Sequence, residues 1–361
     1  VSWASSAVFS CSSSLALAAA LMPWGMTRST ITIARGATAS IYKNTATKNG
    51  GGIYAAAALT ISGALTVGSS TAANGNTATV NGGGRTPGTD KLIFRNVNFV
   101  ADKNSMAFVY TVKSSFAKFI TVENCTFNAN GYSTVYGLYL RHAYDIVIKD
   151  TVVDGLYDIA YGQSAVTRLT AENVTATNVT YGFWMPYGSD LVFKNLDIQA
   201  NDTGIYIYNN SGGTATIEDV TINAGHHAVV LEGRAAKTNT LVFNGTNNLV
   251  GGTDNIQLRP YQTVDATLKI VVNDAGITDA DIVGADAKIG NVYYNTLEKA
   301  LAAEGDTVTL VTDVTRASVT TGSKTIDQYT FYVDGVKVTP VEKDGKYYVA
   351  VPDIAAQHLD T

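Results

Sequence analysis

An eight-residue pattern that recurs six times constrains this chain more than any other feature of its sequence. In each copy apolar residues alternate with other residues up to a fifth position that is always Asn or Asp. The fifth-position residues are Asn96, Asn124, Asp150, Asn173, Asn195 and Asp219. They follow one another at spacings of 28, 26, 23, 22 and 24 residues. A period in this range predicts a stack of similar structural units.

A second apolar segment follows each copy of the pattern from the second one onward, and a further one follows a looser seventh copy, "LVFNGTNN" from Leu241. These segments are "GLYLR" from Gly137, "DIAYG" from Asp158, "GFWMP" from Gly182, "GIYIY" from Gly204, "HAVVL" from His227 and "NIQLR" from Asn255. Asn and Gly between the segments favour turns. The sequence therefore predicts two strands per coil of a parallel β-solenoid, with insertions confined to loops.

Side-chain alternation along these second strands predicts which residues fill the interior. One apolar column would hold Leu138, Ile159, Phe183, Ile205 and Ile256, and the other Leu140, Tyr161, Met185, Ile207 and Leu258. The six Asn and Asp residues are expected to form an inward ladder that bonds to the turn backbone of neighbouring coils. Adjacent rungs should be about 4.8 Å apart, the usual spacing of paired strands.

The region before the six copies repeats as well. "NTATKNGGG" starts at Asn44 and "NTATVNGGG" at Asn76, 32 residues later, and they differ only where Lys48 is replaced by Val80. A near-copy at such an offset indicates one structural unit used twice.

On these residues the chain resembles the right-handed parallel β-helix superfamily, the pectate-lyase-like solenoids, over about residues 31–258. The two near-copies and "GGIYAAAALTISG" also resemble the Gly-Gly-aromatic repeats of bacterial surface proteins, including polymorphic outer-membrane-type adhesins. The resemblance implies an all-β, extracellular protein that is either a polysaccharide-active enzyme or a surface-exposed shaft.

The two ends of the chain differ from its middle. Residues 1–30 contain an apolar, Ser-rich run that lacks the positive region of an export signal. They are interpreted either as the remnant of such a signal or as a first rung of the solenoid, and residues 31–260 are assigned to the β-helix proper.

Two further units are predicted after the β-helix. In residues 261–325, Asn295 or Thr296 is expected to cap a short helix that ends near Gly305 and leads into a strand. Residues 326–361 are predicted to form a small β domain that is cut short, with hairpin turns at Asp334-Gly335 and Asp344-Gly345.

Composition and charge argue against several classes of partner. Charged residues make up 15% of the chain and the formal net charge is −5, so no basic surface for nucleic acid is expected. No segment is expected to span a membrane. Cys11 and Cys125 are far apart, outside any CxxC motif, and indicate neither a zinc site nor a disulfide framework.

The sequence offers no recognisable catalytic constellation, and neither a metal nor a cofactor is expected. The outward position in the first strand, the seventh of each copy, carries Asn98, Thr126, Val152, Thr175, Asp197 and Thr221, of which only Asp197 is acidic. Asp202 has no acidic partner one coil away and is interpreted as a turn residue. His226 and His227 are adjacent, so they should face opposite sides of a strand and not share one ion.

An outward strip of aromatic residues is the one candidate contact surface. Tyr139, Trp184 and Tyr206 should lie in one outward column that Ala160 interrupts, with Arg141 and Tyr208 two residues further along their strands. Such a strip is suited to stacking on sugar rings or to a protein interface; alternatively a loop or the tail packs over it.

Two functions remain open from the sequence. The first is a non-enzymatic, extracellular or cell-surface β-helix that adheres or assembles, with itself or surface glycans as partner. The second is a carbohydrate-active β-helix enzyme, a polysaccharide lyase or glycosidase, whose site lacks the recognised motifs.

Overall fold

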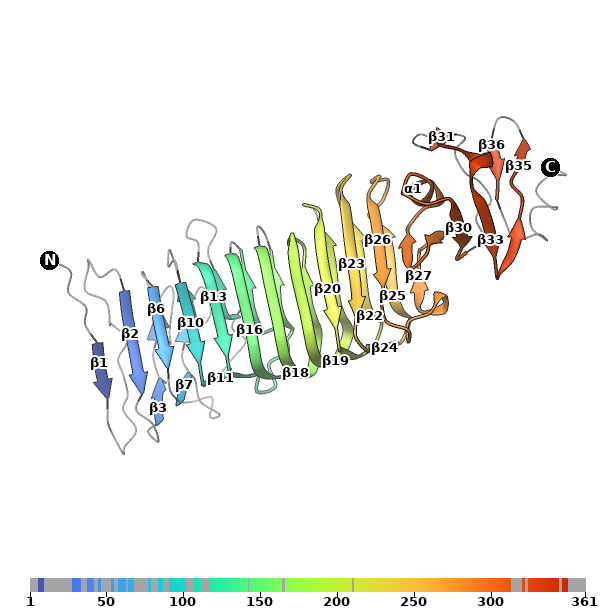
Figure 1. Ribbon diagram of the computed structural model, residues 1–361. Helices are drawn as coiled ribbons and strands as arrows, with labels where there is room; N and C mark the ends of the chain where they lie inside the picture. Colours follow the sequence, from blue (N-terminus) through green and yellow to red (C-terminus); the bar gives the residue numbers. More distant parts are fainter. Residues whose placement is uncertain are drawn as a thin grey trace.

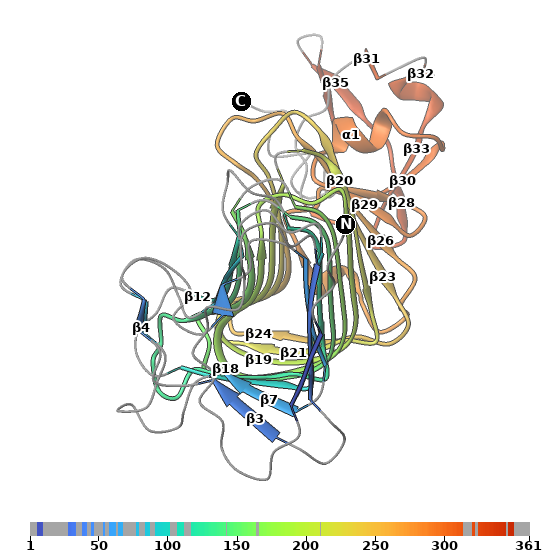
Figure 2. The ribbon, with the colours of Figure 1, turned by 90° about the vertical axis from the view of Figure 1, so that its left-hand side faces the viewer.

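The computed structural model describes residues 6–9, 28–33, 38–41, 45–46, 53–54, 58–62, 64–67, 77–78, 84–86, 91–101, 107–111, 117–141, 143–163, 166–209, 211–312, 320–321, 324–343 and 346–349 of the 361-residue chain. These residues form an elongated stack of coils with a smaller module at its C-terminal end (Figure 1). Successive coils superimpose when viewed along the stack (Figure 2). The chain is an all-β solenoid of the parallel β-helix type.

Three parallel sheets run along the solenoid, because each strand pairs with the equivalent strand of the next coil. The first sheet holds β1 (Ser6–Phe9), β2 (Arg28–Ile33), β6 (Ala58–Ser62), β10 (Lys91–Arg95), β13 (Ala117–Glu123), the first parts of β16 (Ala143–Asp154), β18 (Val166–Met185) and β19 (Asp190–Asn209), then β20 (Gly213–Glu218), β23 (Thr238–Asn244) and β26 (Thr267–Val272).

The other two sheets follow along each coil. The second holds β3 (Thr38–Ile41), β7 (Ala64–Val67), β11 (Val97–Val100), β14 (Thr126–Asn128), later parts of β16, β18 and β19, then β21 (Thr221–Ala224) and β24 (Asn248–Gly251). The third holds β5 (Ile53–Tyr54), β9 (Gly84–Thr86), β12 (Ala107–Thr111), β15 (Tyr136–Leu140), β17 (Asp158–Gly162), the ends of β18 and β19, then β22 (His227–Gly233), β25 (Asp254–Pro260) and β27 (Ile282–Val283).

The six Asn and Asp residues of the repeated pattern form the corner between the first and second sheets. All six are left-handed, with φ between 49° and 54°. Asn and Asp adopt this conformation more readily than other non-glycine residues, because their short side chains can hydrogen-bond locally. One left-handed residue turns the strand, so each copy of the pattern contains two strands. The prediction of two strands per coil is therefore wrong, and the coils have three.

The ladder of corner residues exists, but the prediction that it points inward is wrong. Five of the six residues are exposed and Asn173 is half-buried. Asn173 Nδ2 donates to Asp150 Oδ1 at 2.7 Å, Asn195 Nδ2 donates to Asn173 Oδ1 at 2.6 Å, and Asn124 donates to Asn96. The left-handed residue breaks the in-out alternation, so the fourth and fifth residues of a copy face solvent and the sixth returns to the core.

A column of alternating charge lies beside this ladder on the first sheet. It consists of the fourth residues of the six copies, namely Arg95, Glu123, Lys149, Glu172, Lys194 and Glu218. Ion pairs join them two by two, at 2.6 Å for Arg95–Glu123, 3.3 Å for Lys149–Glu172 and 2.7 Å for Lys194–Glu218.

The solenoid interior is filled by apolar side chains from all three sheets, as the sequence predicts. The residues of the two predicted columns are buried, apart from Tyr161. Ala160 pairs with Leu138 and Phe183 in the inner column, whereas Tyr161 pairs with Tyr139. The predicted inward position of Tyr161 is therefore wrong by one residue of register, and such a shift exchanges the two faces of a strand.

The near-identical stretches at the start of the chain occupy adjacent coils. In them β4 (Thr45–Ala46) pairs in parallel with β8 (Thr77–Ala78), so the offset of 32 residues is one coil. Near the start of the chain, β1 pairs in parallel with β2. Cys11 lies outside the described residues, and Cys125 is a buried free thiol.

Parallel stacking continues past residue 260, through β26 and β27, before the pattern changes. There β29 (Val292–Tyr294) pairs antiparallel with β26, and its other side pairs with β28 (Ala287–Ile289), so the first sheet continues into the C-terminal module. β29 thus covers the edge that β26 would otherwise leave open.

The C-terminal module has one hydrophobic core. Its main elements are β28 (Ala287–Ile289), β29, α1 (Leu297–Leu301), β30 (Thr307–Leu310), β33 (Thr330–Val333) and β34 (Val336–Val338). Minor elements are η2 (Asp279–Asp281), β31 (Thr320–Thr321), β32 (Lys324–Thr325), η3 (Ile326–Gln328), β35 (Val341–Lys343) and β36 (Lys346–Tyr348). Leu297, Val308 and Phe331 belong to the same cluster, so the core extends across the boundary predicted at residue 326.

Two of the local signals predicted in the module are present, one differs, and Asp344 and Gly345 of the second predicted hairpin turn lie outside the described residues. Thr296 caps α1 and accepts a hydrogen bond from the Lys299 amide at 3.2 Å. Asp334 and Gly335 are left-handed at the turn between β33 and β34. The helix is shorter than predicted, because Ala302 and not Gly305 follows its last residue.

Candidate aromatic face on the third sheet

A continuous aromatic column runs along the outer face of the third sheet. Strand pairing places Tyr139 beside Tyr161, Tyr161 beside Trp184, and Trp184 beside Tyr206. The ring centroids of these neighbours are 4.9, 5.4 and 5.5 Å apart. The predicted interruption at Ala160 is wrong, because Tyr161 occupies that outward position.

Further tyrosines widen this column into a surface. Tyr136 contacts Tyr139 and Tyr161 with centroid distances of 5.2 and 5.7 Å, and Tyr181 contacts Trp184 at 4.9 Å. Tyr208 contacts Tyr206 at 5.4 Å. The aromatic face comprises Tyr136, Tyr139, Tyr157, Tyr161, Tyr181, Trp184, Tyr206 and Tyr208.

The rings of the aromatic face differ in exposure. Tyr139 retains only 7% of its accessible surface, since Tyr136, Tyr161 and Ala107 pack against it. Tyr161, Trp184, Tyr206 and Tyr208 are half-buried. A ligand would therefore contact the middle and C-terminal parts of the face, and Tyr139 supports its neighbours from beneath.

A buried carboxyl group lies among these rings. Asp158 is fully buried and pairs through its backbone with Tyr136 and Tyr181 of the adjacent coils. Its Oδ1 accepts a hydrogen bond from the Ala160 amide at 3.0 Å, whereas Oδ2 has no partner within the described residues. Burial raises the pKa of Asp158 well above its ordinary value, so the fold favours the neutral form of this carboxyl group.

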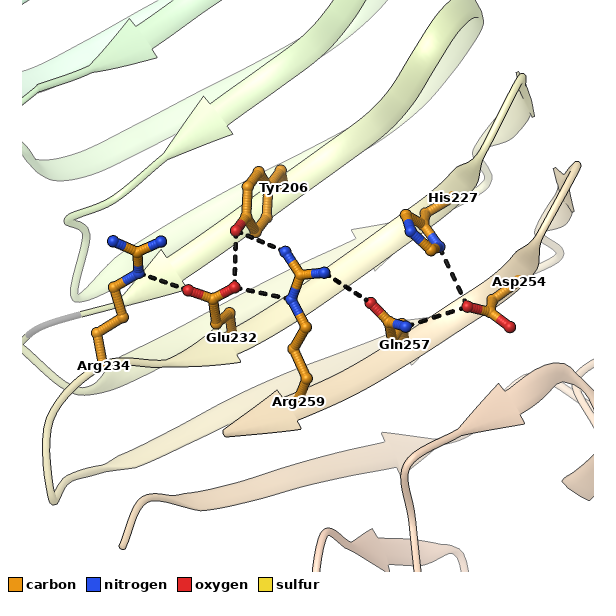
Figure 3. A network of polar contacts seen from close by, with 7 residues as sticks. All are labelled: Tyr206, His227, Glu232, Arg234, Asp254, Gln257 and Arg259. Atoms are coloured by element: carbon orange, nitrogen blue, oxygen red, sulfur yellow. Dashed lines mark hydrogen bonds and ion pairs between the residues drawn. The ribbon is translucent and has the colours of Figure 1, made fainter. Parts of the chain in front are cut away.

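Beyond Tyr206, a polar network continues the face towards the C-terminal end (Figure 3). Glu232 is buried at its centre and accepts hydrogen bonds from Arg234 Nε at 2.5 Å, Arg259 Nε at 2.7 Å and the Tyr206 hydroxyl at 2.7 Å. Burial alone would raise the pKa of Glu232, but the hydrogen bonds from Tyr206 and Arg234 and the charge of Arg259 hold it below the ordinary value. Glu232 is therefore a carboxylate.

Arg259 connects this carboxylate to a second acidic residue. Its terminal nitrogens donate to the Tyr206 hydroxyl at 2.7 Å and to Gln257 Oε1 at 3.2 Å. Gln257 Nε2 in turn donates to Asp254 Oδ2 at 3.1 Å, and His227 Nδ1 lies 3.2 Å from the same oxygen (Figure 3).

Arg234 is held differently from Arg259. Its guanidinium carbon lies 4.0 Å from the ring centroid of Tyr208 and 4.2 Å from that of Tyr261, so the group is sandwiched between two rings. Cation–π contacts of this kind fix the plane of the guanidinium group.

The two histidines contact different carboxylates. His226 Nδ1 is 3.5 Å from Asp202 Oδ2, and the Tyr181 hydroxyl donates to that oxygen at 3.3 Å. Asp202 is thus more than a turn residue, because it connects the edge of the aromatic face to a histidine. Among the described residues, no three His, Cys, Asp or Glu side chains gather as a metal site would require.

The structure brings most of the predicted contact residues together. Trp184, Tyr206 and Tyr208 share the accessible part of the face, and Arg141 directly follows Leu140, the last residue of β15. Asp197 lies apart, exposed on the second sheet between Thr175 and Thr221. The sequence analysis missed Asp158, Tyr161, Glu232, Arg234 and Arg259. The signal that could have found the network was the alternation along "HAVVLEGR", which places Val230 and Glu232 on the same face of the strand.

The fold and the aromatic face define a class, the right-handed parallel β-helix with an aromatic outer surface. Residues 108–259 match the family described as the right handed beta helix region, which covers the coils that carry this face. Comparison with curated proteins gave no match, and comparison with solved structures gave none. Within the part of the chain that the structure describes, no helix has the length and apolar character needed to cross a membrane.

Proposed function

We propose that this protein is a non-catalytic, extracellular adhesive β-helix that binds surface glycans along the aromatic face of its third sheet. The observation that carries the proposal is the unbroken column from Tyr139 to Tyr206. The column continues into an ionic network, so apolar and polar contacts are offered side by side.

Sugar rings suit such a surface for a physical reason. Their C–H faces pack against aromatic rings, while their hydroxyl groups need hydrogen-bond partners at the edges of those rings. The tyrosines provide an apolar ring with a polar hydroxyl tip, and Trp184 provides an apolar ring, since its indole N–H is buried. The rings also contact one another, which limits the side-chain entropy lost on binding.

The charged groups of the face support adhesion more than catalysis. Glu232 is engaged by two arginines and a tyrosine, so it is poorly suited to act as an acid or a base. Asp158 is neutral and lies beneath the rings, where a substrate would reach it only if they moved. The exposed Asp197 belongs to another sheet.

One arrangement favours the alternative, a carbohydrate-active enzyme. Asp158 and Asp202 both neighbour Tyr181, one carboxyl group buried and neutral, and the other beside His226. Glycoside hydrolysis uses two carboxyl groups in different protonation states. This alternative predicts turnover that depends on Asp202 and His226.

A glycan array probed with matched variants tests the proposal. We expect the wild type to bind at least one class of glycan and Trp184→Ala to lower that binding by about tenfold or more, the effect of losing one stacked aromatic contact. Tyr144→Ala is the matched control, because Tyr144 is 54% exposed but outside the aromatic face. Trp184→Phe, which keeps a ring, should retain most of the binding if the fold is intact.

Two results would contradict the proposal. One is a wild type that binds no glycan, and the other is a Trp184→Ala variant that binds as well as Tyr144→Ala. The bound polysaccharides are also incubated with the protein and followed for new reducing or unsaturated ends. Turnover that disappears in Asp202→Asn and His226→Ala would replace adhesion with the enzymatic alternative.

The extracellular setting and the likeness to bacterial surface adhesins are part of the same proposal. They rest on the repeated "NTAT" and Gly-Gly stretches, of which residues 45–46 and 77–78 pair in parallel. Self-assembly is the less favoured mode of action, because β29 covers the edge that β26 would otherwise leave open.

A further inference from the structure

We propose that Arg234 binds an anionic group, a carboxylate or a sulfate, carried by the glycan that lies along the aromatic face. This inference rests on the proposed glycan adhesion and adds the charge of the ligand and the residue that recognises it.

The geometry of Arg234 leaves one edge of its guanidinium group available. Nε is committed to Glu232, while the two terminal nitrogens point away from that carboxylate (Figure 3). Within the described residues, Glu232 is the only acidic partner of Arg234. An edge of two parallel N–H donors matches the two oxygens of a carboxylate or sulfate, the bidentate arrangement for which arginine is suited.

The surroundings of Arg234 prepare this edge for a ligand. The rings of Tyr208 and Tyr261 hold the guanidinium group from both faces, and the hydrogen bond to Glu232 fixes its rotation. Little side-chain entropy is therefore lost when an anion binds. The Arg234 side chain is 32% exposed and Tyr261 is also exposed, so an anion can approach from solvent.

The charge balance of the network favours an anion at this position. Glu232 carries one negative charge, whereas Arg234 and Arg259 carry two positive charges. Arg259 already donates from all three of its nitrogens, to Glu232, Tyr206 and Gln257, whereas Arg234 bonds to Glu232 through Nε alone and faces Tyr206 on one side. The other carboxylate of the network, Asp254, lies at its far end beyond Gln257 and faces His227 (Figure 3).

Binding of three polymers with the same backbone tests the inference. Dextran is neutral, carboxymethyl-dextran adds carboxylates and dextran sulfate adds sulfates. Their affinities are measured by biolayer interferometry at physiological salt for the wild type, Arg234→Gln, Arg234→Lys and Lys237→Gln. Lys237 is the matched control, since it is exposed three residues away and its replacement removes the same charge.

We expect the wild type to bind at least one charged polymer more tightly than dextran. Arg234→Gln should weaken that binding by about tenfold or more, as expected for a lost charge-assisted pair, and Lys237→Gln by less than about twofold. Arg234→Lys keeps the charge but not the planar pair of donors. Its binding of the charged polymer should therefore recover less than half of what Arg234→Gln loses. The preferred polymer identifies the anion as carboxylate or sulfate.

Three results would overturn the inference. They are equal binding of dextran and both charged polymers, no binding of either charged polymer, and equal losses in Arg234→Gln and Lys237→Gln. If the array finds Trp184-dependent binding of neutral glycans alone, glycan adhesion stands and the inference fails. If charged dextrans bind through Arg234 while Trp184→Ala has no effect, the anion site stands and the aromatic adhesion proposal fails.

Discussion

Asp158 shows how one residue on a solvent-facing column can behave as a core residue. It occupies an outward position of the third sheet, yet Tyr136, Tyr157 and Tyr181 surround it and remove it from water. A carboxyl group in such a place remains neutral, because ionisation without a partner is costly. The raised pKa makes the stability of the fold depend on pH in a defined direction.

Asp158→Asn tests this consequence at the residue scale. The unfolded chain ionises Asp158 above about pH 4, while the folded chain keeps the proton, so the unfolded state binds fewer protons and stability falls as pH rises. Asn keeps an oxygen for the Ala160 amide and cannot ionise. We expect the difference in melting temperature, Asp158→Asn minus wild type, to increase between pH 3 and pH 7. A difference that is the same at both pH values would show that the carboxyl group ionises in the fold.

The corner residues show which features of a residue the sequence reveals. The recurrence of Asn or Asp at the fifth position was sufficient to predict a ladder, because few other residues are both small and polar. Its direction was not predictable from alternation, since a left-handed residue interrupts the alternation itself. Tyr161 was misplaced for a related reason: in "DIAYG" the register depends on the bend before the strand.

At the scale of the element, the buried and the exposed columns of the sheets contribute differently to the fold. The core columns provide burial, whereas the exposed column from Arg95 to Glu218 alternates in charge from coil to coil. Exposed ion pairs add little stability, but a strand displaced by one coil would place like charges together. The alternating column therefore favours the observed order of coils over slipped ones.

A pair of substitutions to aspartate tests the inside and outside of these strands. Ile205 is fully buried in the third sheet, whereas Val152 is 52% exposed on the second. We expect Ile205→Asp to lower the free energy of unfolding by several kcal/mol, because it buries an unpaired charge. Val152→Asp should change it by less than about 0.5 kcal/mol. Similar shifts in chemical denaturation would refute the assignment of faces.

At the scale of the whole molecule, the solenoid ends in a module that closes one of its edges. An uncovered edge of a parallel sheet presents free N–H and C=O groups to other chains. Here β29 pairs antiparallel with β26, and the core of the module fixes β29 in place. The sequence showed that the repeat ends near residue 260. It did not show the antiparallel pairing of β29 with β26, because that pairing joins segments that the repeat pattern assigns to separate units.

Disrupting β29 should make the protein associate. Val292 pairs with Val271 at the covered edge, and proline at position 292 would remove a donor and weaken the strand. We expect sedimentation velocity to show larger species for Val292→Pro than for the wild type. Val336→Pro, in the exposed hairpin strand β34, is the control and should not promote association. Equal behaviour of the two variants would mean that β29 does not act as a cap.

The central claim is that the aromatic face of the third sheet is where this protein meets its glycan. Hydroxyl-radical footprinting, with and without the tightest-binding glycan of the array, measures this directly because it reports protection of individual aromatic side chains. The account predicts protection of Tyr161, Trp184 and Tyr206, and none at the exposed Tyr144. Protection at Tyr144 or along the second sheet, with the three column residues unchanged, would contradict it.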